Sequence, residues 1–259
     1  MEQKQALVDI DRLFGLIGYP LSHSFSKGYF AEKFQKEHIE GAFYESFPLA
    51  QIEALPQLLR EYPNLVGLNV TIPYKEQVLP YLTALDADAA TIGAVNTILI
   101  NGAERKGYNT DIYGFETSLV RLFAERQLHP QHALVLGTGG AAKAITFVLD
   151  KLAIDYQFVS RTPKAGQLTY DQLDEEILRK HTLIVNTTPL GMYPNVAACP
   201  NIPYNYISEE HLGFDLIYNP AITQFMQQFL NRGAAAKNGL EMLHLQAEKA
   251  WEIWNATTP

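Results

Sequence analysis

The sequence has a single cysteine, a shortage of basic residues and no long apolar run, and each shortage excludes a class of protein. Cys199 is the only cysteine, so neither an intrachain disulfide nor a cysteine zinc cluster can form. No apolar run approaches the roughly 20 residues that a membrane-spanning helix needs. The 20 Lys and Arg residues are outnumbered by 28 Asp and Glu, and the net charge of −8 argues against a protein that binds nucleic acid through phosphate contacts.

Histidine and the N-terminal segment add two further negative expectations. His129 and His132 flank Pro130 in a predicted connection, where a helical pair of metal ligands is not expected. The N-terminal segment MEQKQALVDIDRLFGLIGYP has too many charges and too short an apolar run for a signal peptide. We therefore expect a cytoplasmic protein without a metal site, and the composition leaves monomer and homodimer both open.

Strand-like and helix-like segments alternate along the 259 residues, which indicates an α/β protein of one large or two ordinary domains. In the first half we expect strands at 13–18, 42–47 and 67–75, helices at 26–38, 52–61 and 75–84, and a hairpin over 95–108 that turns at Asn101-Gly102. In the second half we expect helices at 111–127, 139–152 and 240–254, and strands at 133–137, 156–160, 182–186 and 214–216. This second alternation is typical of a Rossmann-type doubly wound sheet.

A glycine-rich turn opens that second half. The sequence GTGGAAKA, residues 137–144, stands between an apolar strand and a helix, where small residues let the backbone approach a pyrophosphate at the helix N-terminus. Ala142 occupies the last position of the usual glycine fingerprint, and a purely structural turn is the alternative. The strand–turn–helix–strand context favours a dinucleotide site, with cofactor contacts from Gly137, Thr138, Gly139, Gly140 and Ala141.

The end of the following strand predicts which dinucleotide is bound. NAD-binding chains usually carry an acidic residue there, whereas this chain has Ser160-Arg161-Thr162-Pro163-Lys164. A guanidinium can hold a 2′-phosphate through paired hydrogen bonds, and Lys164 adds charge. NADP(H) is therefore the expected cofactor, with contacts from Ser160, Arg161, Thr162 and Lys164.

Polar motifs in both halves identify a family resemblance. HSFS, NVTIPYK, GAVNT and YNTD lie in the first half, and GTGGAAKA, SRT, NTTPLGM, DLIYNP and NGLEML follow in the second. In this order they resemble the shikimate dehydrogenase family over residues 18 to 246. The resemblance implies an NADP-dependent enzyme that reversibly reduces 3-dehydroshikimate to shikimate in the biosynthesis of aromatic amino acids through chorismate.

The resemblance also implies domains and site residues. A substrate-binding domain would cover 1–110, joined by the C-terminal helix 240–259, and an NADP-binding Rossmann domain would cover 111–239. Lys75 and Asp111 would be the catalytic pair. The substrate-binding set would be Ser24, Ser26, Thr71, Lys75, Asn96, Asp111, Tyr218 and Gln246, and Thr187, Thr188 and Gly239 would join the cofactor contacts.

Ketone reduction explains why such residues are needed. Hydride addition leaves negative charge on the oxygen, so a proton donor must lie beside it. Lys75 is the favoured donor, while the division of the proton between Lys75 and Asp111 stays open. A quinate/shikimate dehydrogenase that uses NAD is the alternative enzyme, and a non-catalytic NADP-binding sensor is an alternative of another class.

Overall fold

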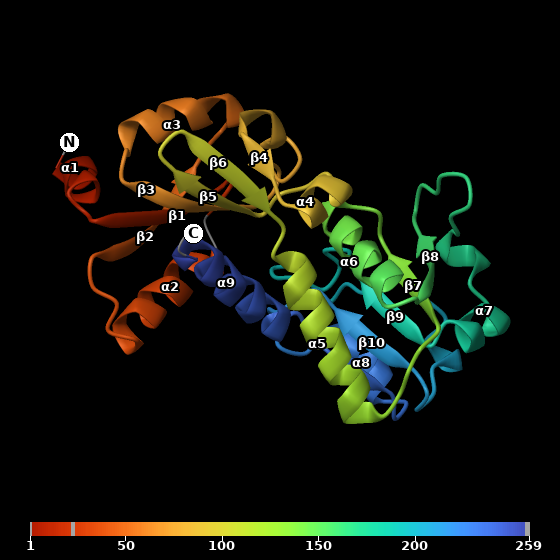
Figure 1. Cartoon of the computed structure of the whole chain (residues 1–259). Coiled ribbons are helices and arrows are strands. Elements are labelled where there is room, and N and C mark those ends of the chain that lie inside the picture. The colour runs from red at the N-terminus through yellow and green to blue at the C-terminus, as the bar shows by residue number, and fades with distance from the viewer. Residues whose placement is uncertain (1, 22–23, 257–259) are drawn as a thin grey trace. The chain divides into compact units, whose positions relative to one another are not determined.

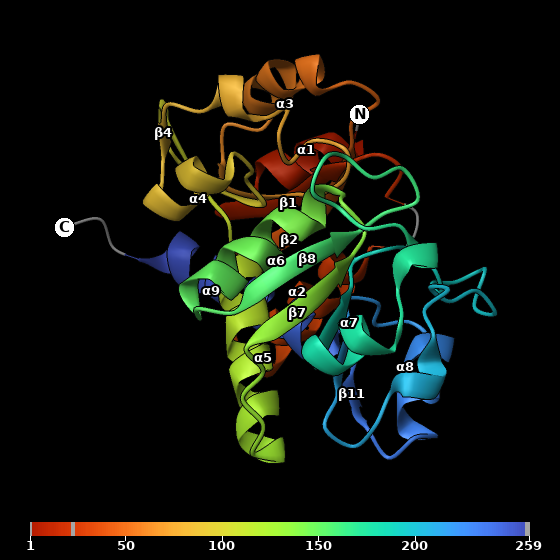
Figure 2. The same ribbon diagram turned by 90° about the vertical axis from the view of Figure 1, so that its right-hand side faces the viewer.

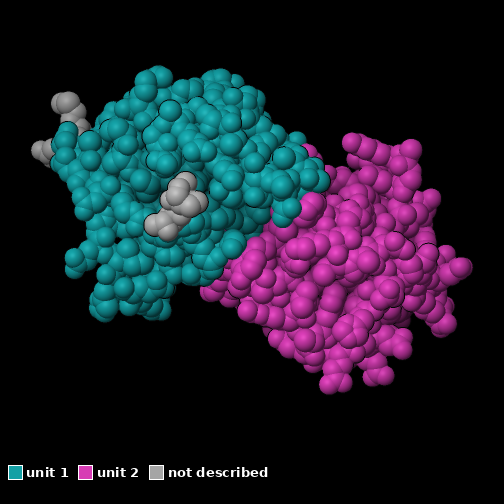
Figure 3. Space-filling model, in the orientation of Figure 1, with its two compact units in different colours: residues 1–110, 247–259 teal, residues 111–246 magenta. Residues whose placement is uncertain are grey.

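The computed structural model describes residues 2–21 and 24–256, which form two compact units (Figures 1 and 3). Unit 1 comprises residues 1–110 and 247–259, and unit 2 comprises residues 111–246. Each unit has a sheet with helices on both faces, which confirms the predicted α/β class (Figures 1 and 2). No helix among the described residues has both the length and the apolar character needed to cross a membrane.

Unit 1 has a six-stranded mixed sheet with the order β2-β1-β3-β5-β6-β4. Strand β1 runs parallel to β2 and β3, whereas β3, β5 and β6 are successively antiparallel. The elements are α1 (Glu2–Val8), β1 (Arg12–Gly18), α2 (Phe25–Lys36), β2 (Ala42–Pro48), η1 (Ile52–Ala54), α3 (Leu55–Glu61), β3 (Leu65–Val70), η2 (Leu79–Tyr81), β4 (Ala84–Leu85), α4 (Ala87–Ile92), β5 (Thr97–Asn101), β6 (Glu104–Tyr108) and the second half of α9 (Leu240–Asn255).

The core of unit 1 follows from the alternation along β1. Leu13 and Ile17 pack in the cluster that includes residues of α1 and α3, and Phe14 packs on the other face with α2 and α9. There Trp254 of α9 is buried, and its indole N–H donates to the Ile98 carbonyl at 3.0 Å. A Cβ on Gly67 would lie 2.4 Å from that indole nitrogen, so only glycine allows this contact.

The segment after β3 differs from the prediction. Strand β3 ends at Val70, and the helix predicted over 75–84 is wrong: turns, η2 and β4 occupy this stretch. Pro80 has no N–H for a helical hydrogen bond, and the Thr83 N–H donates to the Arg105 carbonyl on β6 at 2.9 Å. Pairing with β6 therefore replaces the helix.

Unit 2 has a five-stranded parallel sheet with the order β8-β7-β9-β10-β11, so the predicted doubly wound architecture is confirmed. Helices α5 and α6 cover one face and α7 and α8 the other (Figures 1 and 2). Because the strand order reverses between β7 and β9, the ends of these strands form the switch point where such sheets bind ligands. The elements are α5 (Asp111–Arg126), β7 (His132–Leu136), α6 (Gly140–Lys151), β8 (Asp155–Val159), η3 (Tyr170–Gln172), α7 (Glu175–Lys180), β9 (Leu183–Asn186), η4 (Tyr204–Tyr206), β10 (Leu212–Asp215), α8 (Gln224–Leu230), β11 (Ala235–Lys237) and the first half of α9.

Candidate functional site

The two predicted serines lie at the start of α2 in unit 1. Ser24 is the N-cap residue, yet its side chain makes no capping hydrogen bond. Its hydroxyl oxygen is buried, and no described residue supplies a hydrogen-bond partner. A buried hydroxyl without a partner is energetically unfavourable, so it is suited to a polar ligand that completes it. His23, which begins the HSFS motif, lies outside the described residues.

Ser26, which is half-buried, begins a chain of polar side chains whose other members are buried. It shares a side-chain hydrogen bond with Tyr44, and the Tyr44 hydroxyl donates to Asn69 Oδ1 at 2.7 Å. Burial raises the pKa of Tyr44 above its usual value, so the phenol stays a neutral donor. Asn69 Nδ2 then donates to Thr97 Oγ1 at 3.2 Å. The HSFS and NVTIPYK motifs, distant in sequence, are thus joined through Tyr44.

The chain continues from Thr97 to the end of the hairpin. Thr97 Oγ1 donates to Asn96 Oδ1 at 3.1 Å, and the same oxygen accepts the Thr110 backbone N–H at 2.7 Å. Asn96 Nδ2 donates to Thr110 Oγ1 at 3.1 Å. Asn96 thus contacts the residue that precedes Asp111, as the fold of the hairpin predicts. We call the residues Ser26, Tyr44, Asn69, Thr97, Asn96 and Thr110 the buried polar chain.

Thr71 and Lys75 lie in the turns after β3 rather than on the strand. The Thr71 N–H donates to the Ile17 carbonyl at 2.9 Å, and its carbonyl accepts the Tyr74 N–H at 2.9 Å. The Lys75 carbonyl accepts the Val95 N–H at 2.7 Å, just before Asn96. Both side chains are half-buried. The backbone around Lys75 is therefore fixed to the segment that begins the hairpin.

Four further predicted residues belong to unit 2. Asp111 is the first residue of α5, where a carboxylate is favoured by the helix dipole. Gln246 lies on α9, which packs closely on α5: a Cβ on Gly114 would lie 2.5 Å from the Met242 carbonyl and 3.3 Å from Gln246 Cβ. Tyr218 follows β10 and is half-buried. Gly239 packs so tightly that a Cβ would lie 2.2 Å from the Leu216 carbonyl.

The start of α9 is anchored within unit 2 by Glu241. Its carboxylate accepts from Ser118 Oγ and Arg121 Nη1, each at 2.7 Å, and pairs with Lys237. Partial burial opposes ionisation of this group. The hydrogen bonds from Lys237, Arg121 and Ser118 outweigh it and lower the pKa of Glu241 to about 2. The helix that carries Gln246 is thus held at its beginning by charge-assisted contacts.

The glycine-rich turn lies at the switch point, with the loop after β9 beside it. Gly137 has a φ of +99°, and a Cβ there would lie 2.9 Å from Thr187 Oγ1 and 3.0 Å from Thr188 Cγ2. A Cβ on Gly139 or Gly140 would meet nothing within 4 Å. Gly139 is the N-cap of the twelve-residue helix α6, and no side-chain hydrogen bond caps this helix. The structure therefore brings Gly137, Thr187 and Thr188 together, next to an open helix N-terminus.

The loop after β8 holds the residues predicted to select the nucleotide. Ser160 is buried, its N–H donates to the Leu168 carbonyl at 2.9 Å, and its hydroxyl accepts the Thr162 N–H at 3.2 Å. Arg161 and Lys164 are exposed, and the Lys164 N–H donates to Gln167 Oε1 at 3.0 Å. The loop backbone is thus fixed, while both cationic side chains are accessible to a phosphate.

A buried carboxylate behind the β9 loop was missed at the sequence level. Asp215 Oδ1 accepts from Asn186 Nδ2 at 3.0 Å and from the Ile217 N–H at 3.1 Å, and Oδ2 accepts from Thr223 Oγ1 at 2.6 Å. Asn186 in turn accepts from the Thr188 hydroxyl at 2.7 Å. Burial raises the pKa of Asp215 to about 6 despite these hydrogen bonds. Neither Asp215 nor Tyr44 belongs to the predicted site residues, yet each connects to predicted residues through hydrogen bonds.

Within the described ranges 2–21 and 24–256, no group of three or more His, Cys, Asp or Glu side chains is placed to hold a metal ion.

Comparison with known proteins agrees with the sequence motifs. The family model described as the shikimate dehydrogenase substrate binding domain matches residues 16–98. A protein from Carboxydothermus hydrogenoformans named shikimate dehydrogenase (NADP(+)) is 36% identical over 96% of this chain and 93% of its own length. A protein of the same name from Clostridium beijerinckii is 40% identical over 93% of this chain and 91% of its own length.

A solved structure is also similar. The Thermus thermophilus shikimate 5-dehydrogenase in complex with NADP(H) and shikimate is 31% identical, with a TM-score of 0.80 over 96% of this chain and 95% of that one. Likeness in sequence and in fold thus extends over nearly the whole chain, in both units. The chain belongs to the shikimate dehydrogenase family.

Proposed function

We propose that this chain is an NADP-dependent shikimate dehydrogenase, an oxidoreductase that reversibly reduces 3-dehydroshikimate to shikimate. The relatives at 36% and 40% identity carry the name of the NADP-dependent enzyme, and the Thermus structure is a complex with NADP(H) and shikimate. Within the structure, the buried polar chain carries the proposal, because it fixes polar motifs from four separate segments of unit 1 as one set. The reaction belongs to aromatic amino acid biosynthesis.

We propose that unit 1 supplies most of the substrate contacts. A triol acid offers hydroxyl and carboxylate groups that need directional partners, and Ser24, Ser26, Thr71 and Asn96 present hydroxyl and amide groups. The Ser24 hydroxyl, which has no hydrogen-bond partner among the described residues, supports this role most directly, because a bound hydroxyl or carboxylate would satisfy it. Tyr218 and Gln246 of unit 2 are the remaining proposed substrate contacts.

The proposed proton chemistry rests on Lys75 and Asp111. Reduction places negative charge on the former ketone oxygen, and the Lys75 ammonium can donate a proton to it. Asp111 is the proposed second member of this catalytic pair. In the oxidation direction the neutral amine would take the alcohol proton. The Val95 N–H donates to the Lys75 carbonyl, which fixes the main chain from which the Lys75 side chain extends.

The nucleotide residues of unit 2 fit NADP(H), which when bound supplies the hydride. The open space at Gly139 and Gly140 would receive the pyrophosphate against the N-terminus of α6, where Thr138 and Ala141 complete the turn. Exposed Arg161 and Lys164 would hold the 2′-phosphate, with Ser160 and Thr162 shaping their loop. Thr187, Thr188 and Gly239 would line the rest of the cofactor site.

Two features support the choice over the alternatives. Oxidation of quinate with NAD is not favoured, because the relatives from Carboxydothermus, Methanosphaera and Clostridium beijerinckii, at 34–40% identity, are named for NADP. A non-catalytic sensor would not need Lys75 and Asp111, which are both present. A cytoplasmic location is part of the proposal and agrees with a single free cysteine; monomer or homodimer stays a prediction.

The test measures, by absorbance, the reduction of NADP⁺ by purified protein with shikimate. Control assays replace NADP⁺ with NAD⁺, or shikimate with quinate, at matched concentrations. Turnover with shikimate and NADP⁺ that exceeds every other combination supports the proposal. An Arg161→Gln variant should raise KM for NADP⁺ by roughly tenfold, the loss expected for a charge-assisted hydrogen bond, and leave KM for NAD⁺ unchanged. Equal turnover with quinate and NAD⁺ would refute the assignment.

A further inference from the structure

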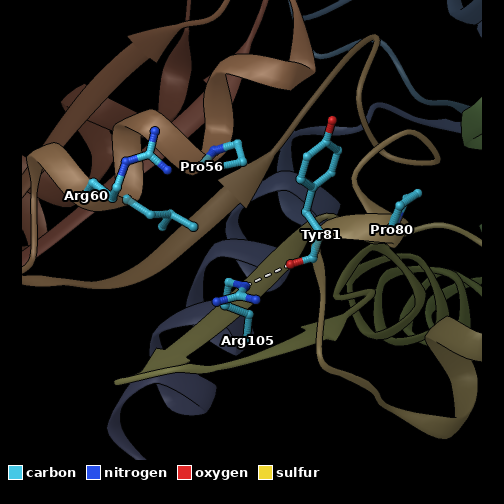
Figure 4. A pocket seen from close by; sticks show the side chains of 6 residues that line it. Pro56, Arg60, Pro80, Tyr81 and Arg105 are labelled. Carbon is cyan, nitrogen blue, oxygen red and sulfur yellow. Dashed lines mark hydrogen bonds between the residues drawn. The ribbon is translucent and has the colours of Figure 1, made fainter.

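Unit 1 contains a pocket that the proposed reaction does not use. It has a volume of about 410 Å³ and is lined by Pro56, Leu59, Arg60, Pro80, Tyr81 and Arg105. Figure 4 shows α3 on one side, with Arg60 and Pro56, and the η2 segment on the other, with Pro80 and Tyr81; Arg105 of β6 lies beneath Tyr81. None of the six is a residue assigned to substrate or cofactor.

Arg105 is held in a defined orientation by backbone oxygens. Its Nε donates to the Tyr81 carbonyl at 2.8 Å and its Nη1 to the Ala103 carbonyl at 3.1 Å (Figure 4 draws the first). These bonds use two of the five N–H donors of a guanidinium, which leaves three for a ligand. The backbone N–H of Arg105 donates to the Thr83 hydroxyl at 2.8 Å, which also fixes the main chain that carries this side chain. The group is therefore preorganised, so little entropy is lost when an anion binds to it.

Arg60 adds a second positive charge on the facing wall. It is exposed in the last turn of α3, and its guanidinium attracts the neighbouring Glu61 electrostatically. The neighbouring carboxylate of Glu61 is engaged elsewhere, with Lys4 Nζ at 2.8 Å and Gln57 Nε2 at 2.8 Å. Two permanent cations therefore line one pocket whose lining contains no carboxylate.

The chemistry of this lining selects a class of ligand. Two guanidiniums repel each other and attract a carboxylate or phosphate, which they can bind through paired hydrogen bonds. The apolar walls formed by Leu59, Pro56 and Pro80 suit a hydrocarbon ring or chain. We propose that this pocket binds a small organic anion, with its acidic group between Arg60 and Arg105 and its apolar body against the proline and leucine walls.

Calorimetric titration of the full chain at constant ionic strength tests the proposal. Benzoate and phenyl phosphate are the probes, benzamide is the neutral counterpart, and the two anions distinguish a carboxylate preference from a phosphate preference. We expect saturable binding of at least one anion and none of benzamide. Arg60→Gln and Arg105→Gln should each weaken it about tenfold, the loss of one charge-assisted hydrogen bond.

Two matched variants locate the site. Arg126→Gln removes an exposed arginine from α5 in unit 2 and should leave anion binding unchanged. Arg161→Gln removes the arginine proposed for the cofactor phosphate. If the Arg161→Gln variant loses anion binding while the Arg60→Gln variant keeps it, the anion binds at the nucleotide loop and the proposal is overturned. Absence of saturable anion binding, or equal binding of benzamide, would overturn it as well. Arg60 is exposed, so its variant tests the pocket without disturbing the fold.

Discussion

Replacing Asp215 by asparagine should remove the contribution that this buried carboxyl makes to the pH dependence of stability between about pH 4 and pH 6. The Asp215 side chain is fully buried, and its pKa is raised from 3.8 to about 6. Between these two pH values the unfolded carboxyl is ionised while the folded one keeps its proton. Unfolding then releases a proton, so the free energy of unfolding falls as the pH rises through this window and levels off above pH 6.

The expected magnitude follows from the shift. Each pKa unit corresponds to about 1.36 kcal/mol, so a shift from 3.8 to about 6 amounts to about 3 kcal/mol between the two ends of the window. Asparagine does not titrate there. The difference in free energy of unfolding between wild type and Asp215→Asn should therefore change by this amount from pH 4 to pH 6.5, in favour of the wild type at low pH.

Denaturant unfolding of wild type and Asp215→Asn at half-unit pH steps measures this difference. An Asp171→Asn variant, which removes an exposed carboxylate from the same unit, is the control and should follow the wild type. A carbon-13 titration of the Asp215 carboxyl by NMR reports the pKa directly. Parallel curves for wild type and Asp215→Asn, or a carboxyl that titrates near pH 4, would refute the reasoning.

Three further variants test other parts of the molecule. Lys75→Ala should lower kcat by far more than it raises KM for shikimate in steady-state assays, and near-normal turnover would contradict the proton role. Gly137→Ala should raise KM for NADP⁺ by roughly tenfold, because the φ of +99° and the 2.9 Å approach of Thr187 mean that an added Cβ would strain the turn. An unchanged KM would place the nucleotide elsewhere. Trp254→Phe should lower the free energy of unfolding by about 1–3 kcal/mol, because the Ile98 carbonyl loses its buried donor; equal denaturation midpoints would show that this contact contributes nothing.

Features governed by local chemistry were predicted from the sequence. The turn at Gly137 needs only a strand, small residues and a helix in succession, and β7 and α6 flank it as predicted. Helix α4 had comparable signals, since Asp86 caps it by accepting the Asp88 N–H at 3.2 Å and Gly93 ends it at a φ of +68°. That helix was missed although its capping residues are visible in the sequence.

Features that depend on long-range contacts could not be predicted in the same way. Pairing of Thr83 with Arg105, 22 residues later, replaces the helix predicted over 75–84. Tyr44 lies in a correctly predicted strand, yet nothing in its neighbourhood indicates that it joins Ser26 to Asn69. The motifs predict which residues form the site, and tertiary contacts alone reveal what holds those residues in place.

Unit 1 is built from two segments that are distant in the sequence, and this affects the order in which the chain folds during synthesis. Its N-terminal 110 residues leave the ribosome first, yet its core also contains Ala247, Ala250 and Trp254 from the end of α9. Unit 2 is complete once Gln246 has emerged. The portion made first must therefore wait, with the face of β1 that carries Phe14 incompletely covered, until the last residues arrive, so the later unit can reach its native state before the earlier one.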